Sequence, residues 1–131
     1  MKKNFRIFLA VAATFIIAAC GNSTQEATSV AKDFLTSYCS TDYHTAASCC
    51  TEDLGKALMV AVEEYYAMEE KVREDVMDIS SAVVTTITSV EAISKDSVLV
   101  KYYIVMPEPG PTLHSTLTIT NVDGNWRVAE F

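Results

Sequence analysis

The stretch Ser97–Met106, "SVLVKYYIVM", decides the fold. Its residues divide between two faces with a period of two, which is the period of a β-strand. One face carries Val98, Val100, Tyr102 and Ile104, and the other carries Leu99, Lys101, Tyr103 and Val105. The segment therefore predicts a strand whose first face is buried.

Strand signals continue on both sides of this stretch. The preceding segment 81–93 is rich in β-branched residues, and Lys95-Asp96 is the expected turn. After it, the Pro-rich segment 107–111 cannot lie inside a ladder and predicts a rigid loop. Segment 112–122 alternates again, and "DGN" at 123–125 predicts a hairpin into a last strand at 126–131. Four consecutive strands indicate an antiparallel meander.

Upstream of the strands the period changes to that of a helix. A first helix is expected over 28–40, capped by Thr28 or Ser29, and a short second helix follows Thr41 or Asp42. A third helix is expected over 51–78, although Gly55 and Glu69 suggest that it bends or begins late. Its expected apolar stripe consists of Leu58, Val62, Tyr65, Val72, Val76 and Ile79. Helices followed by an antiparallel meander predict an α+β fold, with N-terminal helices packed on one face of a curved four-stranded sheet.

The first nineteen residues have the composition of a secretory signal. Three basic residues precede an uncharged run from Ile7 to Ala19, which is 13 residues long. This run is shorter than the roughly 20 residues of a membrane-spanning helix. A basic start, a short apolar run and small residues at its end are typical of a signal peptide.

The end of this signal resembles the lipobox of bacterial lipoprotein precursors, which Ile17-Ala18-Ala19-Cys20 fits at all four positions. The resemblance implies cleavage between Ala19 and Cys20 and a diacylglycerol on the Cys20 thiol. Gly21, rather than an acidic residue, implies sorting to the outer membrane, with the periplasmic and the exterior face both open. The alternative is an ordinary secreted protein in which Cys20 is incidental. Residues 20–27 are then expected to form the lipidated terminus and a polar tether, and residues 28–131 a single domain.

The charge of the chain excludes one class of partner. The signal contains three of the ten basic residues and none of the seventeen acidic ones, so the mature chain has a net charge of −10. Nucleic acids and anionic lipid surfaces are bound by clustered positive charge, so a nucleic-acid function is not expected.

Three cysteines remain after Cys20, and export to an oxidising compartment predicts one disulfide among them. Cys39 can pair with Cys49 or Cys50, and we favour Cys50. A bridge between the neighbouring Cys49 and Cys50 would be strained. The spacing is not the C-x-x-C of redox enzymes, so the cysteines are interpreted as structural.

The order of elements resembles the nuclear transport factor two-like superfamily of cone-shaped, cystatin-like domains. Segment 30–53 is similar to its opening helix pair with a Tyr-x-x-Ala step, and 121–131 to its final hairpin with a Gly-x-Trp step. More narrowly, the chain is similar to small lumazine-binding-like lipoproteins of bacteria, a domain of unknown function. Members of the superfamily include isomerases, dehydratases, hydrolases and binding modules, so the resemblance does not give a function.

A cone of this kind can be lined by aromatic rings, and the expected lining residues are Tyr38, Tyr65, Tyr102 and Trp126. The other interpretation is that these rings simply fill the core. Glu130 is the one acid expected at an inward strand position, so no catalytic acid–tyrosine pair can be assigned.

Other polar groups give weaker indications. His44 and His114 lack a second ligand at helical spacing, so neither a metal site nor a cofactor is expected. The acids of segment 63–78 form either a strip that binds a cation or a partner, or a solvated helix face. The polar strand face of His114, Thr116, Thr118 and Thr120 is either open to solvent or a homodimer surface.

Together these patterns predict a lipid-anchored protein of the cell envelope, without catalytic activity, that binds a small ligand or a protein partner. The alternatives are an isomerase or dehydratase that uses an acid and a tyrosine, and a structural protein that dimerises through its sheet.

Overall fold

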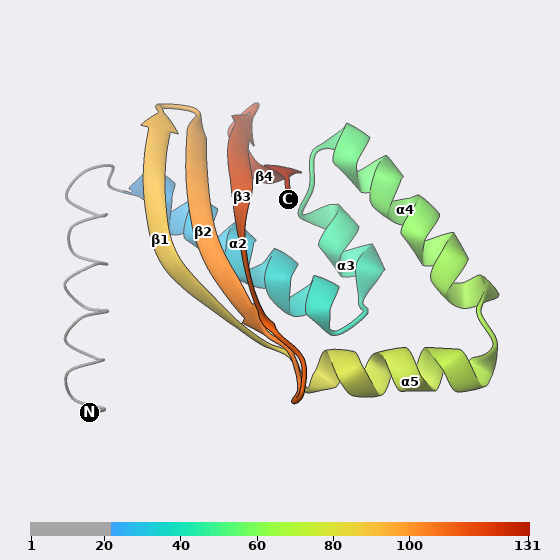
Figure 1. Cartoon of the computed structure of the whole chain (residues 1–131). Coiled ribbons are helices and arrows are strands. Elements are labelled where there is room, and N and C mark those ends of the chain that lie inside the picture. Colours follow the sequence, from blue (N-terminus) through green and yellow to red (C-terminus); the bar gives the residue numbers. More distant parts are fainter. Residues whose placement is uncertain (1–21) are drawn as a thin grey trace.

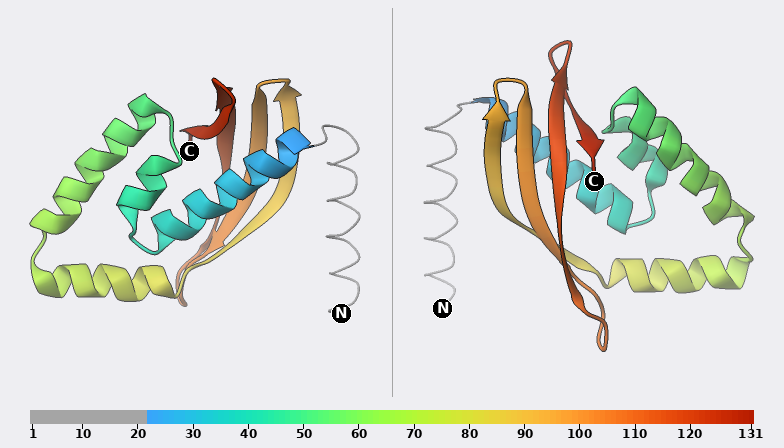
Figure 2. Two further views of the ribbon diagram at one scale, coloured as in Figure 1. Left: turned by 180° about the vertical axis from the view of Figure 1, so that it is seen from behind. Right: turned by 45° about the horizontal axis from the view of Figure 1, so that its top comes forward.

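The computed structural model describes residues 22–131 and confirms the α+β fold. Four helices precede four strands in this part of the chain, and the strands form one antiparallel sheet in the order β1-β2-β3-β4. Helix α2 packs on one face of the sheet, and no helix of residues 22–131 covers the opposite face (Figures 1 and 2). The helices are α2 (Asn22–Cys39), α3 (Tyr43–Ser48), α4 (Glu52–Ala67) and α5 (Glu70–Ser81). The strands are β1 (Val84–Ser94), β2 (Ser97–Val105), β3 (Thr112–Val122) and β4 (Asn125–Glu130).

The first helix begins earlier than the sequence suggests. It starts at Asn22, and Thr24 and Ala27 are already buried. Thr28, one of the two expected caps, instead donates a hydrogen bond from Oγ1 to the carbonyl oxygen of Thr24 at 2.6 Å. The predicted tether is therefore wrong over residues 22–27, and the domain begins before residue 28. Residues 22–27 are small and polar, so the sequence contained no sign that the helix starts there. Small residues on one face of a helix can nevertheless pack closely on a sheet.

The core forms between α2 and the inner face of the sheet. Ala27, Ala31 and Phe34 are fully buried at helical spacing along α2. They pack with the alternate residues of the strands, as the period-two pattern predicts: Val98, Val100, Tyr102, Leu117, Ile119, Trp126 and Val128. The hairpins also follow the prediction, since Lys95-Asp96 is a turn and Asp123 and Gly124 have φ of 53° and 88°.

Helix α3 is capped at its start and hydrogen-bonded to the edge of the sheet at its end. Asp42 is its N-cap, with Oδ1 accepting a hydrogen bond from the Thr45 amide at 3.3 Å. At the other end, the Thr51 amide donates to the carbonyl oxygen of Val128 at 2.9 Å, and the Val128 amide donates to that of Cys49 at 2.8 Å. The link from α3 to α4 thus continues the sheet beyond β4, and it sets where α4 starts.

The long third helix that the sequence predicts is two helices. Met68 and Glu69 have extended backbone, with ψ of 152° and 145°, and separate α4 from α5. Leu58, Val62 and Tyr65 of α4 are buried, whereas α5 buries no residue. The prediction of one continuous buried stripe is therefore wrong beyond Tyr65. We call α4 and α5 together the arm: α4 runs away from the sheet, and α5 returns to the start of β1 (Figure 1).

Candidate functional site

A chain of aromatic rings runs from α2 through α3 into α4. The Tyr38 ring lies with its centroid 5.7 Å from that of Phe34, 5.2 Å from Phe131 and 5.6 Å from Tyr43. Tyr43 continues to Tyr65 at 5.6 Å, and Tyr65 to Tyr66 at 5.3 Å. Most of these pairs are edge-on, the arrangement that aromatic quadrupoles favour. The chain connects the buried Phe34 to Tyr66, which is 59% exposed on the arm.

The four residues expected to line a cone divide into two groups. Tyr38 and Tyr65 belong to the aromatic chain, where the ring of Tyr43 lies between them and contacts both. Tyr102 and Trp126 belong to the core under α2. Each of the four therefore has a packing role, which the sequence analysis considered as the alternative to a ligand site.

Burial raises the pKa of the Tyr38 phenol, and the nearby Cys39 and Tyr102 add to the effect. Burial likewise raises the pKa of Tyr43, with contributions from Tyr38, Tyr65 and Cys39. Both phenols therefore remain protonated at neutral pH and can donate hydrogen bonds but not act as bases. Apart from burial, the groups that raise the pKa values of these two phenols are other tyrosines and a thiol, and no carboxylate contributes.

Glu130 does not face the core, contrary to the expectation from alternation. The register between β3 and β4 shifts between Thr118 and Ile119, which places Glu130 opposite Thr118. Its Oε1 accepts a hydrogen bond from Thr118 Oγ1 at 3.3 Å, and the residue is exposed. A one-residue shift moves a side chain to the other face of a sheet, so the sequence pattern alone could not place this carboxylate.

The three cysteines of the described domain are free thiols, so the expected Cys39–Cys50 disulfide is not formed in this structure. The buried Cys50 donates from Sγ to the carbonyl oxygen of Ala46 at 3.2 Å. Burial, and then the neighbouring Cys49, raise the pKa of Cys50 to about 12. Burial also raises the pKa values of Cys39 and Cys49. Protonated thiols are poor nucleophiles, which agrees with a structural role.

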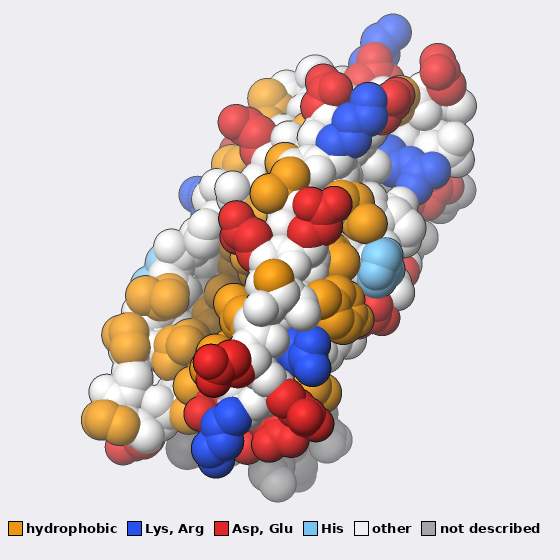
Figure 3. Space-filling model, turned by 90° about the vertical axis from the view of Figure 1, so that its right-hand side faces the viewer, with side chains coloured by type: hydrophobic (Ala, Val, Ile, Leu, Met, Phe, Trp, Pro, Cys, Tyr) orange, Lys and Arg blue, Asp and Glu red, His pale blue; other side chains and the backbone are white. Residues whose placement is uncertain are grey.

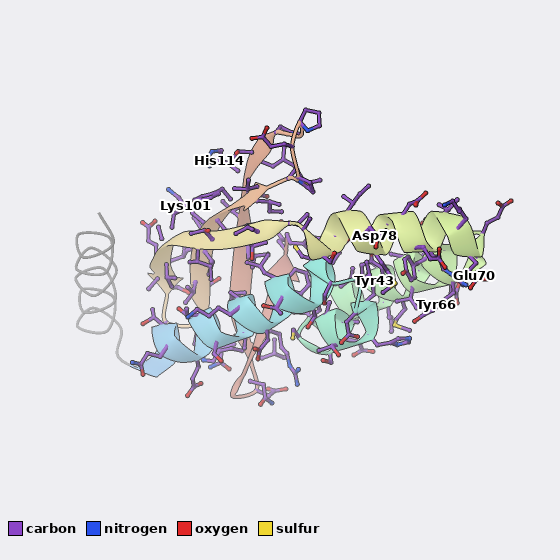
Figure 4. All side chains as sticks on the ribbon, turned by 90° about the horizontal axis from the view of Figure 1, so that it is seen from below. Tyr43, Tyr66, Glu70, Asp78, Lys101 and His114 are labelled. Atoms are coloured by element: carbon purple, nitrogen blue, oxygen red, sulfur yellow. The ribbon has the colours of Figure 1, made fainter. Side chains whose placement is uncertain are left out.

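The histidines lie apart and are exposed. His44 is on α3, while His114 on the outer face of the sheet has its ring 5.8 Å from that of Tyr103 (Figure 4). Within residues 22–131 no group of three or more histidine, cysteine or acidic side chains is placed to hold a metal ion. The outer face, with its threonines, Lys101 and His114, is uncovered by any helix (Figure 4).

The arm carries seven of the thirteen large apolar side chains that are exposed among the described residues. Several large apolar side chains are exposed on it: Met59, Val60, Tyr66, Met68, Val72, Met77 and Ile79. Hydrophobic and acidic side chains alternate over this side of the molecule (Figure 3). Figure 4 places Tyr66, Glu70 and Asp78 along the same two helices. A set of exposed apolar residues of this kind marks an interaction surface.

The angle of the arm is stabilised by a hydrogen bond across the break. Arg73 Nη1 of α5 donates to the carbonyl oxygen of Tyr66, in the last turn of α4, at 3.2 Å. The last carbonyls of a helix have no partner within the helix, so this contact also caps α4. This hydrogen bond helps to hold α5 at its angle to α4, apart from the core of the domain. From the sequence, the acids of segment 63–78 suggested a strip that binds a cation or a partner. The exposed apolar side chains beside them were not expected, since Val72 and Ile79 were placed in the apolar stripe of one helix.

Comparison with protein families and with curated proteins gives no match for this chain. None of the helices in residues 22–131 is long and apolar enough to cross a membrane.

Proposed function

We propose that this chain is a lipid-anchored protein of the bacterial cell envelope, of the nuclear transport factor two-like type, that binds a protein partner and has no catalytic activity of its own. The observation that carries the binding role is the arm, where α5 buries no residue and its apolar side chains are exposed. The signal, the lipobox and Cys20 support the anchor, although all of them lie outside the described residues.

A protein partner is favoured over a small ligand in a cone. Of the residues that would line a cone, Tyr38 and Tyr65 lie against other aromatic rings at centroid distances of 5.2 to 5.6 Å, and Tyr102 and Trp126 are buried in the core. When aromatic rings pack on one another in this way, they occupy the space that a ligand would need. Recognition of a partner then depends on the surface of the protein. The exposed position of Glu130 also removes the one acid that the enzyme hypothesis could have used.

The proposal is tested by mass spectrometry of the protein purified from its own membranes. We expect the amino-terminal peptide to begin at Cys20 and to carry acyl chains, since two or three chains make anchoring stable. An unmodified Cys20 would overturn the anchor. Native spectra of the same sample are expected to show a protein partner. A small molecule released only on denaturation would support the cone instead, and a dimer without other partners would support the structural hypothesis.

The same sample also decides the disulfide. Spectra recorded with and without reductant report whether Cys39 pairs with Cys50 or Cys49 in the oxidising compartment. A bridge closing this short loop would stabilise the domain by about 2.5–3 kcal/mol.

A further inference from the structure

We propose that the arm binds a basic amphipathic helix of the partner protein. This inference rests on the proposed function, in that it names the chemistry of the protein partner. It follows from the burial, composition, charge and position of α4 and α5.

The first argument is that α5 has an apolar face without a cover. Val72, Val76 and Ile79 follow one another at intervals of four and three residues, which is the spacing of a helix-packing stripe. Val72 is 44% and Ile79 52% exposed. A 12-residue helix is marginal in water when tertiary packing does not stabilise it. A helix laid along this stripe would supply the missing packing.

The second argument concerns the type of apolar residue. Three methionines, Met59, Met68 and Met77, are exposed on α4, at the break and on α5. Methionine is unbranched and flexible, so it adapts to the side chains of an incoming helix and is frequent at surfaces that bind amphipathic helices. A rigid sheet face would offer no such adaptation.

The third argument is charge complementarity. Residues 52–81 contain nine acidic and three basic side chains, which gives a net charge of −6. Helical spacing puts Glu70 and Glu74 across α5 from the apolar stripe, and Asp75 and Asp78 on one side of it. A helix with lysines or arginines beside its apolar face would pair with them, and opposite charges raise the association rate. A second copy of this chain, or an anionic lipid surface, would bring like charges to the same place.

The fourth argument is position. Helix α2 starts two residues after Cys20, and its 18 residues span about 27 Å. The arm lies at the end of the domain where α2 finishes (Figures 1 and 2). An anchor at Cys20 therefore leaves the arm available to a protein rather than requiring it at the membrane.

The experiment measures binding of a synthetic peptide to the full protein, purified from its own membranes into phosphatidylcholine nanodiscs. The probe is a helical peptide with leucines on one face and lysines on the other. One control has the same composition in scrambled order, and a second has glutamates in place of the lysines. We expect the basic amphipathic peptide to bind at least about tenfold more tightly than either control, with an affinity that falls as salt rises.

Matched variants locate the site. Ile79→Gln on α5 is compared with Ile93→Gln at the end of β1, because these isoleucines are similarly exposed, at 52% and 59%. Asp75→Lys on α5 is compared with Glu91→Lys on β1, since both carboxylates are exposed. The two α5 changes are expected to weaken binding several-fold and the two β1 changes to leave it unaltered. All four residues are exposed, so folding is expected to survive each change.

Equal binding of the three peptides, or equal weakening by the α5 and β1 variants, would overturn the inference. A concentration-dependent dimer that protects the α5 amides from hydrogen exchange would replace it with a second copy. Binding to anionic but not to zwitterionic vesicles through α5 would replace it with a lipid surface. These results are separate from the test of the proposed function: an acylated protein with a bound partner but no affinity for the peptide would leave that function standing and remove only this inference.

Discussion

Helices α2 and α5 are both amphipathic, yet α2 is the centre of the core and α5 buries no residue in the described structure. Ala31 and Phe34 of α2 are fully buried, whereas the apolar residues Val72 and Ile79 of α5 remain about half exposed. The sequence pattern of the two helices is similar in kind. The difference teaches that an apolar stripe predicts a helix and a contact, but does not say whether the contact lies within the same chain.

The local composition explains why α2 is covered. Ala27 and Ala31 are small, so the helix approaches the sheet closely and Phe34 reaches between the strands. In α5 the stripe is bordered by Asp75 and Asp78, which would need to lose water if α5 folded back onto the core. The arm therefore remains extended from the domain.

The largest expected effect follows from removing a core ring. Phe34→Ala should lower the free energy of unfolding by about 3–5 kcal/mol, because it leaves a cavity and removes the contacts with Tyr38 and Phe131. Ile79→Ala on α5 should change it by less than about 0.5 kcal/mol. Urea denaturation followed by circular dichroism measures both.

These two variants test whether α2 is covered and α5 uncovered in the free protein. A loss of similar size from Ile79→Ala would mean that α5 is covered in the free protein. The m-value provides the control, since an unchanged m-value shows that the same surface is exposed on unfolding in each variant.

A second effect appears at alkaline pH and is smaller. The pKa of Cys50 is raised to about 12 in the folded state, above the ordinary value of 9.0. Between these values the unfolded chain loses the thiol proton first, so stability is complete below about pH 9 and decreases as pH rises toward about 12. Unfolding free energies at about pH 8 and about pH 10 should therefore differ less in Cys50→Ala than in the original chain.

Cys39→Ala is the matched control for this measurement. Burial raises the pKa of the Cys39 thiol as well, but that thiol is only partly buried, whereas the buried Cys50 also donates its proton to the Ala46 carbonyl. If Cys50→Ala retains the full pH dependence, the buried thiol is not its source.

The sequence predicted the sheet well because local patterns determine it. Alternation placed Val98, Val100 and Leu117 inward, and the turn residues Asp123 and Gly124 closed the last hairpin. The register of the β3–β4 pair could not be predicted in the same way. The shift beside Thr118 turns Glu130 outward, and the local sequence contains no pattern that indicates such a shift.

The candidate site was predicted only in part. The aromatic residues were recognised, but whether a ring faces a ligand or another ring depends on tertiary contacts such as Tyr38–Tyr43, which spacing does not give. The acids of the arm were recognised as a candidate strip for a cation or a partner, but the exposure of its apolar side chains was missed, because the stripe continues from Tyr65 to Val72 in sequence. The extended backbone at Met68 and Glu69 then redirects α5 away from the core.

The next effect concerns the short helix that connects the two regions. Asp42→Ala should lower the unfolding free energy by about 1 kcal/mol, because it removes the cap on the Thr45 amide. Asp42→Asn should retain most of this stability, since asparagine caps nearly as well. Chemical denaturation of both variants measures the difference, and equal losses would show that the cap contributes through charge rather than through its hydrogen bond.

The smallest effect on stability, and the most informative for the arm, comes from Arg73→Ala. Its guanidinium donates to the Tyr66 carbonyl on the surface, so its loss should change the global unfolding free energy by less than about 1 kcal/mol. Hydrogen exchange should nevertheless become faster across α5 and unchanged in α2, because the two helices open separately. Arg73→Lys, which keeps the charge but has a compact ammonium group, separates the hydrogen bond from simple electrostatics. If exchange accelerates equally in α2 and α5 after Arg73→Ala, the arm and the core unfold as one unit, and the apolar face of α5 is not an independent surface.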